Sequence, residues 1–410
     1  KFPYFAENIS KYFWIWMKPR VFLINNYSME NAYSLWEKGL SGSHHVWGKV
    51  ELDKKGKVDM RIFPHEKYPL LNKIGEFFGI GHLDQQIRLL RNLKKFDILY
   101  SPYSSSNTKF LVLLKFLGLF KKPIVVTIHQ PFWQGKNENP LYRFLSRLYI
   151  LSYDACIFLS EPLMKKTVSL LNISEKDANN KFSLTQWGPD ITYLDKFNPS
   201  HLPFESCDYF ISAGHTDRDF ETLIEAFRGL EYKLWIFCTP ESIPKTTDIP
   251  PNVRVNSVVT RSYDLIPYYQ KSIAILIPLK YPEHKEGCQG MTSLQDVVSF
   301  SKPAIMTRNP CLNLDIEKEG IGKYVDMYDV QGWKKQLTFF ASNKASWEKM
   351  SENSRLLFET KFNSEIFASH LEKVLLATFQ EKSTLKHKIE YDESLTESYK
   401  TQPFQKGNDI

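Results

Sequence analysis

Short apolar runs alternate with amphipathic segments along the first half of the chain, beginning at Arg20. The runs are rich in branched and aromatic residues, which favour β-strands, while the segments between them have helical spacing. The predicted helical segments are 42–55, 85–93 and 108–120. The predicted strand segments are 20–24, 58–63, 96–102, 123–129, 154–161 and 181–190.

The same alternation restarts in the second half. Helices are predicted over 218–230 and 346–362, with one more helix reaching about residue 378. The predicted strands are 208–214, 232–239, 252–259, 274–279 and 303–307. Strands that alternate with helices imply right-handed βαβ crossovers, and therefore parallel sheets with helices on both faces.

A cluster of prolines and polar residues at 198–204 indicates a linker between two domains. We therefore predict an N-terminal arm (1–19), a first Rossmann-like domain (20–197), a second one (205–379) and a loose polar tail (380–410). Two doubly wound α/β domains would leave a central cleft where the carboxyl ends of both sheets face each other, which is the usual position of a ligand.

Composition narrows the class of protein. The 410 residues are 42% hydrophobic and 24% charged, typical of a globular chain, and the net charge is +7. That charge suits a solvated basic surface, an anionic substrate or an anionic membrane surface, and no nucleic-acid-binding signature is present. The five scattered cysteines fit neither a disulfide framework nor a zinc site, so a reducing cytoplasm is the expected setting. No signal peptide is visible, and the longest apolar-aromatic run, 12–17, is too short to span a bilayer.

The segment 212–227, SAGHTDRDFETLIEAF, runs from a strand through a glycine turn into a helix. Asp217 is the expected N-cap, and acids in the next turn suit a positive helix start. Arg218 is the unusual residue, because a helix start disfavours a cation. Beside Gly214, which lets the backbone approach a ligand, its guanidinium suits a phosphate. An exposed arginine bridging to an acid is the alternative, and capping explains Asp217-Arg218-Asp219 better than a metal-binding D-x-D.

A second candidate anion site is the helix start in 287–307, GCQGMTSLQDVVSFSKPAIMT. Met291, Leu294, Val297 and Val298 are expected to pack on the sheet. The amides of Gly290, Met291 and Thr292 would then present a positive helix end to a phosphate, and Ser293 could add a hydroxyl. Gln295 lies off the apolar stripe and could reach a ligand above the helix. The alternative is an ordinary helix start with Thr292 and Ser293 as local caps.

The first half offers two weaker candidates. Gly42, Ser43 and His44 precede a predicted helix and form a possible anion cradle. The adjacent rings of His44 and His45 are expected to point apart, which disfavours a metal pair. His129 ends an apolar strand, so its ring could face the cleft and bond a substrate hydroxyl, although it could also be an ordinary loop histidine.

These stretches together resemble the GT-B glycosyltransferases, specifically the retaining GT4-like group. The resemblance covers about half of the chain. In the second half it runs from ISAGHTDRDFETLIEAF through GMTSLQDVVSFSKPAIMT to GIGKYVD and SWEKMSENSRLLFETKF. In the first half, SGSHHVWGKVELDKKG, VVTIHQPF, DACIFLSE and WGPDITYL fit more loosely.

The resemblance implies a nucleotide-diphosphate sugar held by the second domain and an acceptor held by the first. Arg218 and the amides after Gly290 would neutralise the leaving diphosphate without a metal or another cofactor. His129 matches the histidine near the transferred sugar. Glu286 and Gln295 correspond to the family's paired acids, one near the sugar hydroxyls and one near the ribose. The sequence departs from the family here, because Glu286 is one place off and Gln295 replaces an acid.

A lysine that pairs with the arginine in this family is not evident either, and Lys280 and Lys285 are the possible substitutes. On the acceptor side, the segments 11–20 and 115–122 combine apolar residues with flanking cations. They could be interfacial segments at the inner face of the cell membrane, or an arm and a core helix with a basic end.

The sequence thus predicts a cytoplasmic, metal-independent hexosyltransferase that moves a sugar, with retention, from a nucleotide sugar to a hydroxyl acceptor. A glycan or a lipid-linked glycan precursor is the expected acceptor, as in polysaccharide biosynthesis, with peripheral membrane contact. The rivals are a GT-B-fold sugar-nucleotide epimerase and a catalytically weak GT-B scaffold that binds a glycan or a protein.

Overall fold

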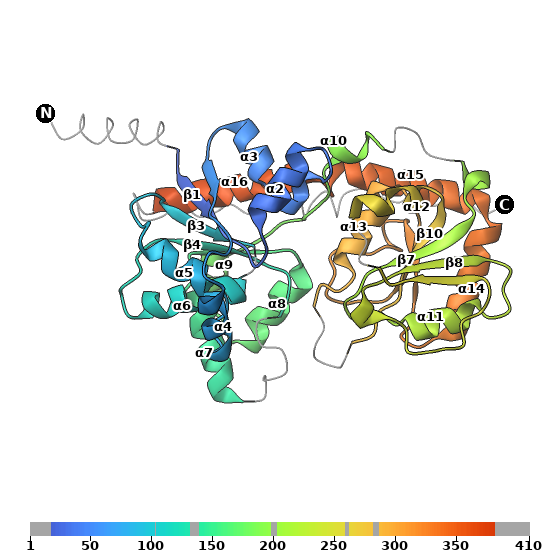
Figure 1. Ribbon diagram of the computed structural model, residues 1–410, viewed down its shortest axis with the longest axis horizontal. Helices are drawn as coiled ribbons and strands as arrows, with labels where there is room; N and C mark the ends of the chain where they lie inside the picture. The colour runs from blue at the N-terminus through green and yellow to red at the C-terminus, as the bar shows by residue number, and fades with distance from the viewer. Residues whose placement is uncertain are drawn as a thin grey trace, which may run out of the picture.

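The computed structural model describes residues 18–102, 104–131, 139–197, 203–258, 262–281 and 287–381. They form two lobes side by side (Figure 1), each built on a six-stranded parallel sheet. The first sheet has the strand order β2-β1-β3-β4-β5-β6. Its strands are β1 (Arg20–Leu23), β2 (Asp59–Ile62), β3 (Ile98–Ser101), β4 (Ile124–Ile128), β5 (Ala155–Phe158) and β6 (Phe182–Leu184).

Helices cover both faces of the first sheet, as expected for parallel strands. One face packs on α2 (Met29–Glu37), the 3-10 helix η1 (Ser43–Val46) and α3 (Lys49–Lys55). The other packs on α5 (Leu83–Leu90), α6 (Ser104–Phe116), α7 (Pro140–Leu151) and α8 (Glu161–Leu170). The lobe also contains α4 (Pro69–Phe77) and α9 (Glu175–Lys181).

The second sheet has the order β12-β11-β10-β7-β8-β9. Its strands are β7 (Tyr209–Ala213), β8 (Lys233–Phe237), β9 (Val253–Asn256), β10 (Ser272–Ile277), β11 (Ala304–Thr307) and β12 (Gly322–Val325). One face packs on α12 (Ile266–Gln270), α13 (Met291–Ser299) and α15 (Lys344–Thr360), and the other on α11 (Phe220–Phe227) and α14 (Val330–Ser342). Three 3-10 turns complete the lobe: η2 (Phe204–Ser206), η3 (Pro240–Ser242) and η4 (Ser262–Leu265).

Two helices cross between the lobes. Tyr193 and Leu194 of α10 (Ile191–Leu194) lie in the core of the second lobe, although we expected this segment in the first domain. In return, α16 (Ser364–Glu381) lies over the first lobe (Figure 1), where Phe367 and Leu371 are buried beside α3. The chain therefore ties each lobe to the other, and the last predicted helix of the second domain completes the core of the first.

The two parallel sheets confirm the predicted fold class, two Rossmann-like domains. The pattern gave no expectation for β12 or for several helices, α2, α4, α8 and α14 among them. A glycine weakens the local signal in α4, α14 and β12. The arm 1–17, most of the linker and the tail beyond 381 lie outside the described residues. Within the described part of the chain, no helix has both the length and the apolarity to cross a membrane.

Candidate functional site in the cleft between the lobes

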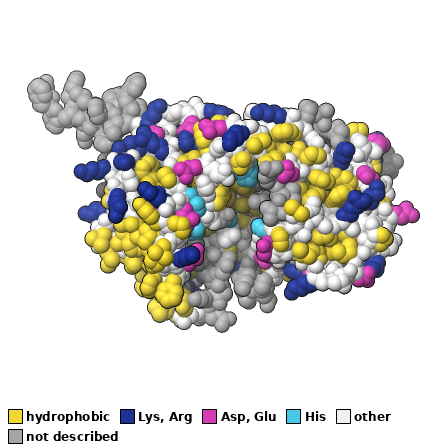
Figure 2. Space-filling model, in the orientation of Figure 1, with side chains coloured by type: hydrophobic (Ala, Val, Ile, Leu, Met, Phe, Trp, Pro, Cys, Tyr) yellow, Lys and Arg dark blue, Asp and Glu magenta, His cyan; other side chains and the backbone are white. Residues whose placement is uncertain are grey.

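A hollow separates the two lobes, with histidine and acidic side chains along its walls (Figure 2). The loops at the carboxyl ends of the strands meet here. The carbonyl of His129, after β4, accepts a hydrogen bond from the amide of Cys288, 3.4 Å away, in the loop before α13. Ser160, after β5, donates to the carbonyl of Cys311, which follows β11 (2.5 Å). The site is therefore assembled from both halves of the chain.

Arg218 is buried at the carboxyl end of β7, with 7% of its surface exposed. Its Nη1 donates to the Thr216 carbonyl (2.9 Å) and its Nη2 to the Ser293 hydroxyl at the start of α13 (2.9 Å). Its Nε is buried with no hydrogen-bond partner, and no carboxylate of the described chain forms an ion pair with it. An exposed arginine bridged to an acid is therefore not what the structure shows.

The electrostatics of Arg218 follow from this burial. Loss of hydration lowers the pKa of the guanidinium to about 10, while the nearby Tyr269, Asp217 and Asp296 favour its charged form. The group stays cationic at neutral pH. A buried cation with one unpaired donor is costly, and an anion that accepts from that donor would offset the cost. The position therefore suits a phosphate group.

The capping expectation at this turn is corrected. Asp219, not Asp217, caps α11, because its carboxylate accepts from the Thr222 amide (3.3 Å). Asp217 has a φ of 51° and accepts instead from the Gln289 side chain (3.0 Å). Gly214, at φ 146°, lies directly beneath the arginine: a Cβ there would come within 2.6 Å of Arg218 Nη2. Gly214 therefore makes room for the guanidinium.

At the start of α13, Gly290 is the N-cap at φ 88°. A Cβ there would lie 2.8 Å from Met306 Cε in the core of the second lobe. The left-handed turn and this close packing are sufficient reasons for a glycine, so no ligand is needed to explain it. Thr292 is exposed and Ser293 is buried beneath Arg218. Leu294, Val297 and Val298 pack on the sheet as expected, whereas Met291 turns towards the first lobe.

Gln295 is buried, and its amide donates to the carbonyl of Trp187 in the first lobe (3.1 Å). The expectation that it lies on an open face of the helix is therefore corrected, and a ribose contact stays a prediction. Lys280, one substitute for the missing lysine, pairs with Glu221 (2.7 Å). Glu286 and Lys285 lie outside the described residues.

At the anion cradle predicted at Gly42 and Ser43, the polar groups of Ser43 already bond side chains of the protein itself. The Ser43 amide donates to the Asp190 carboxylate (2.9 Å), and its hydroxyl bonds the Glu51 carboxylate. The rings of His44 and His45 lie together, with centroids 4.1 Å apart, and do not point apart. Burial lowers the pKa of both rings, that of His45 to about 4. Neutral rings and an internal carboxylate explain this turn without a phosphate.

His129 lies where the sequence predicted it, at the carboxyl end of β4 and beside Trp47, with ring centroids 6.2 Å apart. Burial lowers the pKa of its ring to about 4, so it is neutral through the physiological range. Trp47 stacks on Trp187 at 4.9 Å, and both rings belong to the wall of the first lobe that faces α13. A neutral imidazole can donate or accept one hydrogen bond to a sugar hydroxyl.

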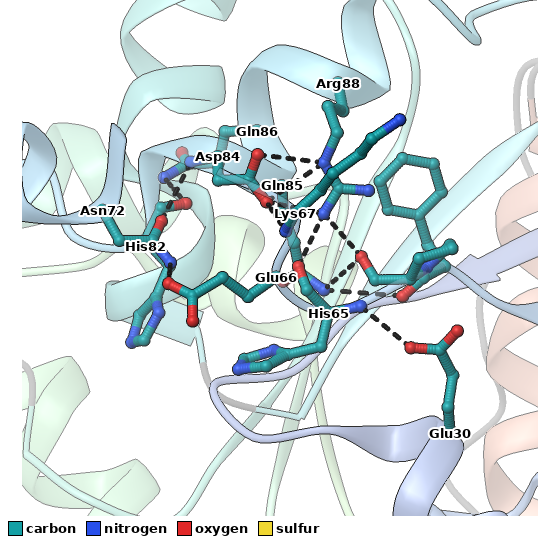
Figure 3. Close-up of polar contacts among 12 residues, drawn as sticks. Glu30, His65, Glu66, Lys67, Asn72, His82, Asp84, Gln85, Gln86 and Arg88 are labelled. Atoms are coloured by element: carbon teal, nitrogen blue, oxygen red, sulfur yellow. Dashed lines mark hydrogen bonds and ion pairs between the residues drawn. The ribbon is translucent and has the colours of Figure 1, made fainter. Parts of the chain in front are cut away.

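Sequence reasoning missed a polar network at the carboxyl end of β2 (Figure 3). Arg88 donates to the carbonyls of Pro64 and His65 (2.7 and 2.6 Å) and pairs with the buried Asp84. These bonds fix the loop 63–67, on which His65 and Glu66 lie at the lobe surface. The string FPHEK after a predicted strand was the available signal, because polar residues at that end of a strand face the cleft.

Asp296 was also missed, because it looks like an ordinary helix residue. Its carboxylate accepts from the Tyr269 hydroxyl (2.8 Å), and burial raises its pKa to about 7. It lies close enough to Arg218 to interact electrostatically. The second lobe therefore holds a partly buried carboxyl near its buried guanidinium.

We expect the Asp296→Asn substitution to change the pH dependence of stability. The folded-state pKa is above the ordinary value of 3.8, so the free energy of unfolding falls as pH rises from about 4 to about 7 in the wild type. Asparagine removes this fall. The stability difference, variant minus wild type, should grow by on the order of 2 kcal/mol over that range in urea unfolding. The exposed Asp326→Asn is the control variant. If the stability difference of Asp296→Asn were as independent of pH as that of Asp326→Asn, the raised pKa of Asp296 would be contradicted.

The similarity of this chain to known proteins lies in its structure. No family model and no curated protein sequence matches it. Sucrose-phosphate synthase from Thermosynechococcus elongatus superposes with a TM-score of 0.62 at 13% identity, covering 89% of this chain and 100% of that one. The fold is GT-B. Anabaena HepE in complex with UDP shares this GT-B architecture (TM-score 0.56, 10% identity, 88% and 100% covered).

A candidate UDP-N-acetylglucosamine 2-epimerase from Listeria monocytogenes also superposes (TM-score 0.52, 12% identity, 89% and 98% covered). The GT-B fold is thus common to the transferases and to the epimerase that we kept as a rival. At these identities the similarity establishes the fold alone, and the activity has to be argued from the residues of the site.

Proposed function

We propose that this protein is a glycosyltransferase that moves a sugar from a nucleotide-diphosphate sugar to a hydroxyl acceptor, with retention and without a metal. The observation that carries the proposal is the buried guanidinium of Arg218 beside the start of α13, whose Nε has no hydrogen-bond partner among the described residues. It supplies a fixed positive charge and an open donor at the carboxyl end of the second sheet, where GT-B proteins and other doubly wound α/β proteins hold ligands.

In this proposal the second lobe stabilises the leaving group. The bond between the anomeric carbon and the β-phosphate oxygen breaks, and the acceptor oxygen forms a bond to that carbon. The acceptor proton leaves with the diphosphate or to solvent. Negative charge grows on the diphosphate, and Arg218 together with the amides at the N-terminus of α13 would oppose it. Ser293 holds the guanidinium in place (2.9 Å), so little reorganisation is needed.

The first lobe would position the sugar and the acceptor. His129 follows β4, and its carbonyl bonds the Cys288 amide in the loop before α13. Its neutral ring would contact the sugar next to the diphosphate. The loop at 63–67, held by Arg88 and Asp84, offers His65 and Glu66 to an acceptor hydroxyl. We further propose a glycan or lipid-linked glycan acceptor at the cytoplasmic face of a membrane. Glu286 keeps its predicted role near the sugar hydroxyls as part of this proposal.

A nucleotide panel tests the proposal. Purified protein is heated with UDP, GDP, ADP or dTDP, each with and without EDTA, and one diphosphate at about 100 times its Kd should stabilise the folded state by about 2.7 kcal/mol in both. UDP is the first probe, because the HepE structure holds it. The matching nucleotide sugar should then be consumed in the presence of a glycan acceptor.

Each outcome separates the alternatives. Interconversion of the sugar without an acceptor would identify an epimerase. Nucleotide binding without turnover would indicate a catalytically weak scaffold, and no response to any diphosphate would overturn the proposal. Stabilisation that disappears with EDTA would contradict the metal-independent seat.

A further inference from the structure

The outer sides of three helices in the first lobe carry a continuous group of exposed apolar side chains. Figure 2 shows it as a hydrophobic region over the lower part of that lobe, where Figure 1 places α4, α6 and α7. We call it the α4–α6–α7 surface. Its most exposed members include Phe77 (84%), Leu70 (69%), Leu119 (67%), Leu117 (62%), Leu141 (62%) and Phe144 (56%).

Hydrogen bonds hold these helices side by side. Lys109 of α6 donates to the carbonyl of Gly79, just after α4 (2.9 Å), and the Thr108 hydroxyl of α6 bonds the Tyr149 hydroxyl of α7 (3.2 Å). The inner side of α6 is fully used, because Leu111 and Val112 are buried in the core. The outer apolar residues are therefore additional to what the core needs, and a group of this kind marks an interaction surface.

Cations accompany the apolar residues. The segments 66–79, 106–122 and 139–151 contain eight lysines and arginines against two acids. Their excess of six accounts for most of the net charge of +7 of the whole chain. Lys67, Lys73 and Lys109 are exposed. The basic character noted in the sequence is thus concentrated on the helices that expose the apolar side chains.

We infer that the α4–α6–α7 surface docks on an anionic lipid bilayer. Leucine and phenylalanine side chains can enter the boundary between headgroups and acyl chains, while lysines and arginines contact anionic headgroups. A second copy of this chain fits the surface less well, because a two-fold interface would place two strongly basic surfaces against each other. The positive charge of the surface therefore favours an anionic bilayer over a second copy of this chain.

The position of this surface also suits a lipid-linked acceptor, an argument that rests on the proposed function. Helix α4 begins at Pro69, directly after the loop that carries His65 and Glu66 (Figure 3). A bilayer against α4 would bring the headgroup of a lipid-linked acceptor next to that loop. The sequence left open whether 115–122 is an interfacial segment or a core helix with a basic end. Phe116, Leu117 and Leu119 are exposed and only Phe120 of this apolar group is buried, which favours an interfacial segment.

Flotation with vesicles tests the surface. Wild-type protein is mixed with phosphatidylcholine vesicles that contain or lack 30% phosphatidylglycerol, an amount chosen on the order of anionic inner leaflets. We expect flotation with the anionic vesicles, weakened by high salt. Phe77→Ser with Phe116→Ser should reduce the bound fraction at least about 10-fold, and Lys67→Glu with Lys73→Glu should remove the preference for anionic lipid.

Matched controls lie on the second lobe. Leu356→Ser with Ile249→Ser changes two exposed apolar residues, and Lys318→Glu with Lys335→Glu changes two exposed lysines. Both should float as the wild type does. Absence of flotation at low salt would overturn the inference, as would a dimer in solution that the Phe77 and Phe116 variant disrupts. The UDP response is measured on every variant, so failure of the proposed function is seen separately from failure of docking.

Discussion

The Arg218→Ala variant is expected to bind UDP about 10- to 100-fold more weakly than the wild type, because a hydrogen bond to a charged group contributes about 1.5–3 kcal/mol. The reason is specific to the position. Arg218 is buried, is held by Thr216 and Ser293, and keeps an Nε without a partner. Alanine removes both the charge and the donors. Isothermal titration with UDP measures the loss, with the best nucleotide of the panel substituted if another base is preferred.

A matched arginine lies just beyond the other end of α11. Arg228 is half-buried and pairs with Glu225 (2.9 Å), away from the proposed site, so Arg228→Ala should leave UDP affinity unchanged. Arg218→Lys should recover only part of the affinity, because an ammonium lacks the planar fork of donors. Since Arg218 forms no ion pair with the residues that the structure describes, its removal also relieves a desolvation cost, and we expect the variant to fold. If a folded Arg218→Ala protein bound UDP as tightly as the wild type does, the proposed role of Arg218 in diphosphate binding would be refuted.

The His129→Ala variant is expected to lose about 100- to 1,000-fold in kcat for sugar transfer while keeping its affinity for UDP. His129 belongs to the first lobe, with its ring beside Trp47 and its carbonyl bonded to the loop before α13, so in this proposal the ring should contact the sugar and not the nucleotide. Steady-state kinetics with the matching nucleotide sugar provide the measurement. Gln130→Ala, the exposed neighbour, is the control and should change kcat by less than about twofold.

The pH profile distinguishes this role from that of an ordinary titrating histidine. Burial lowers the pKa of His129 to about 4, so the ring is neutral throughout the range from 5 to 8. The activity should therefore show no inflection from this residue near 6.5, the ordinary pKa of histidine. A loss of activity in His129→Ala together with an equal loss of UDP affinity would place the residue on the nucleotide and contradict the proposed division between the lobes.

Local pattern was sufficient for the first sheet and for every strand of the second sheet except β12, since strand and helix periods differ and parallel strands need helical crossovers. It was also sufficient to single out Arg218, because a cation at a helix start is unusual whatever surrounds it. The start of α13 and the place of His129 followed from the same reasoning, since the end of each strand fixes the end of the sheet at which the next residues lie.

Local pattern could not predict contacts between residues that lie far apart in the sequence. Asp190 is far from Ser43 in the sequence, yet its carboxylate accepts from the Ser43 amide. The turn at Arg218 is shaped by Gln289, whose amide draws Asp217 away from the helix and leaves Asp219 as the cap. Gln295 is directed by the carbonyl of Trp187 in the other lobe. Such contacts form only once both lobes are in place.

The sequence by itself determined that this chain forms two parallel α/β domains with a basic residue beside a helix start at the carboxyl end of the second sheet. Only the tertiary structure decided which apolar residues are covered. Hydrophobic spacing predicts a helix over 108–120, but not that the apolar residues on its outer side, with those of α4 and α7, stay exposed. The tertiary structure also determined that Arg218 is buried with an Nε that has no hydrogen-bond partner among the described residues, because burial depends on segments that meet only after the chain has folded.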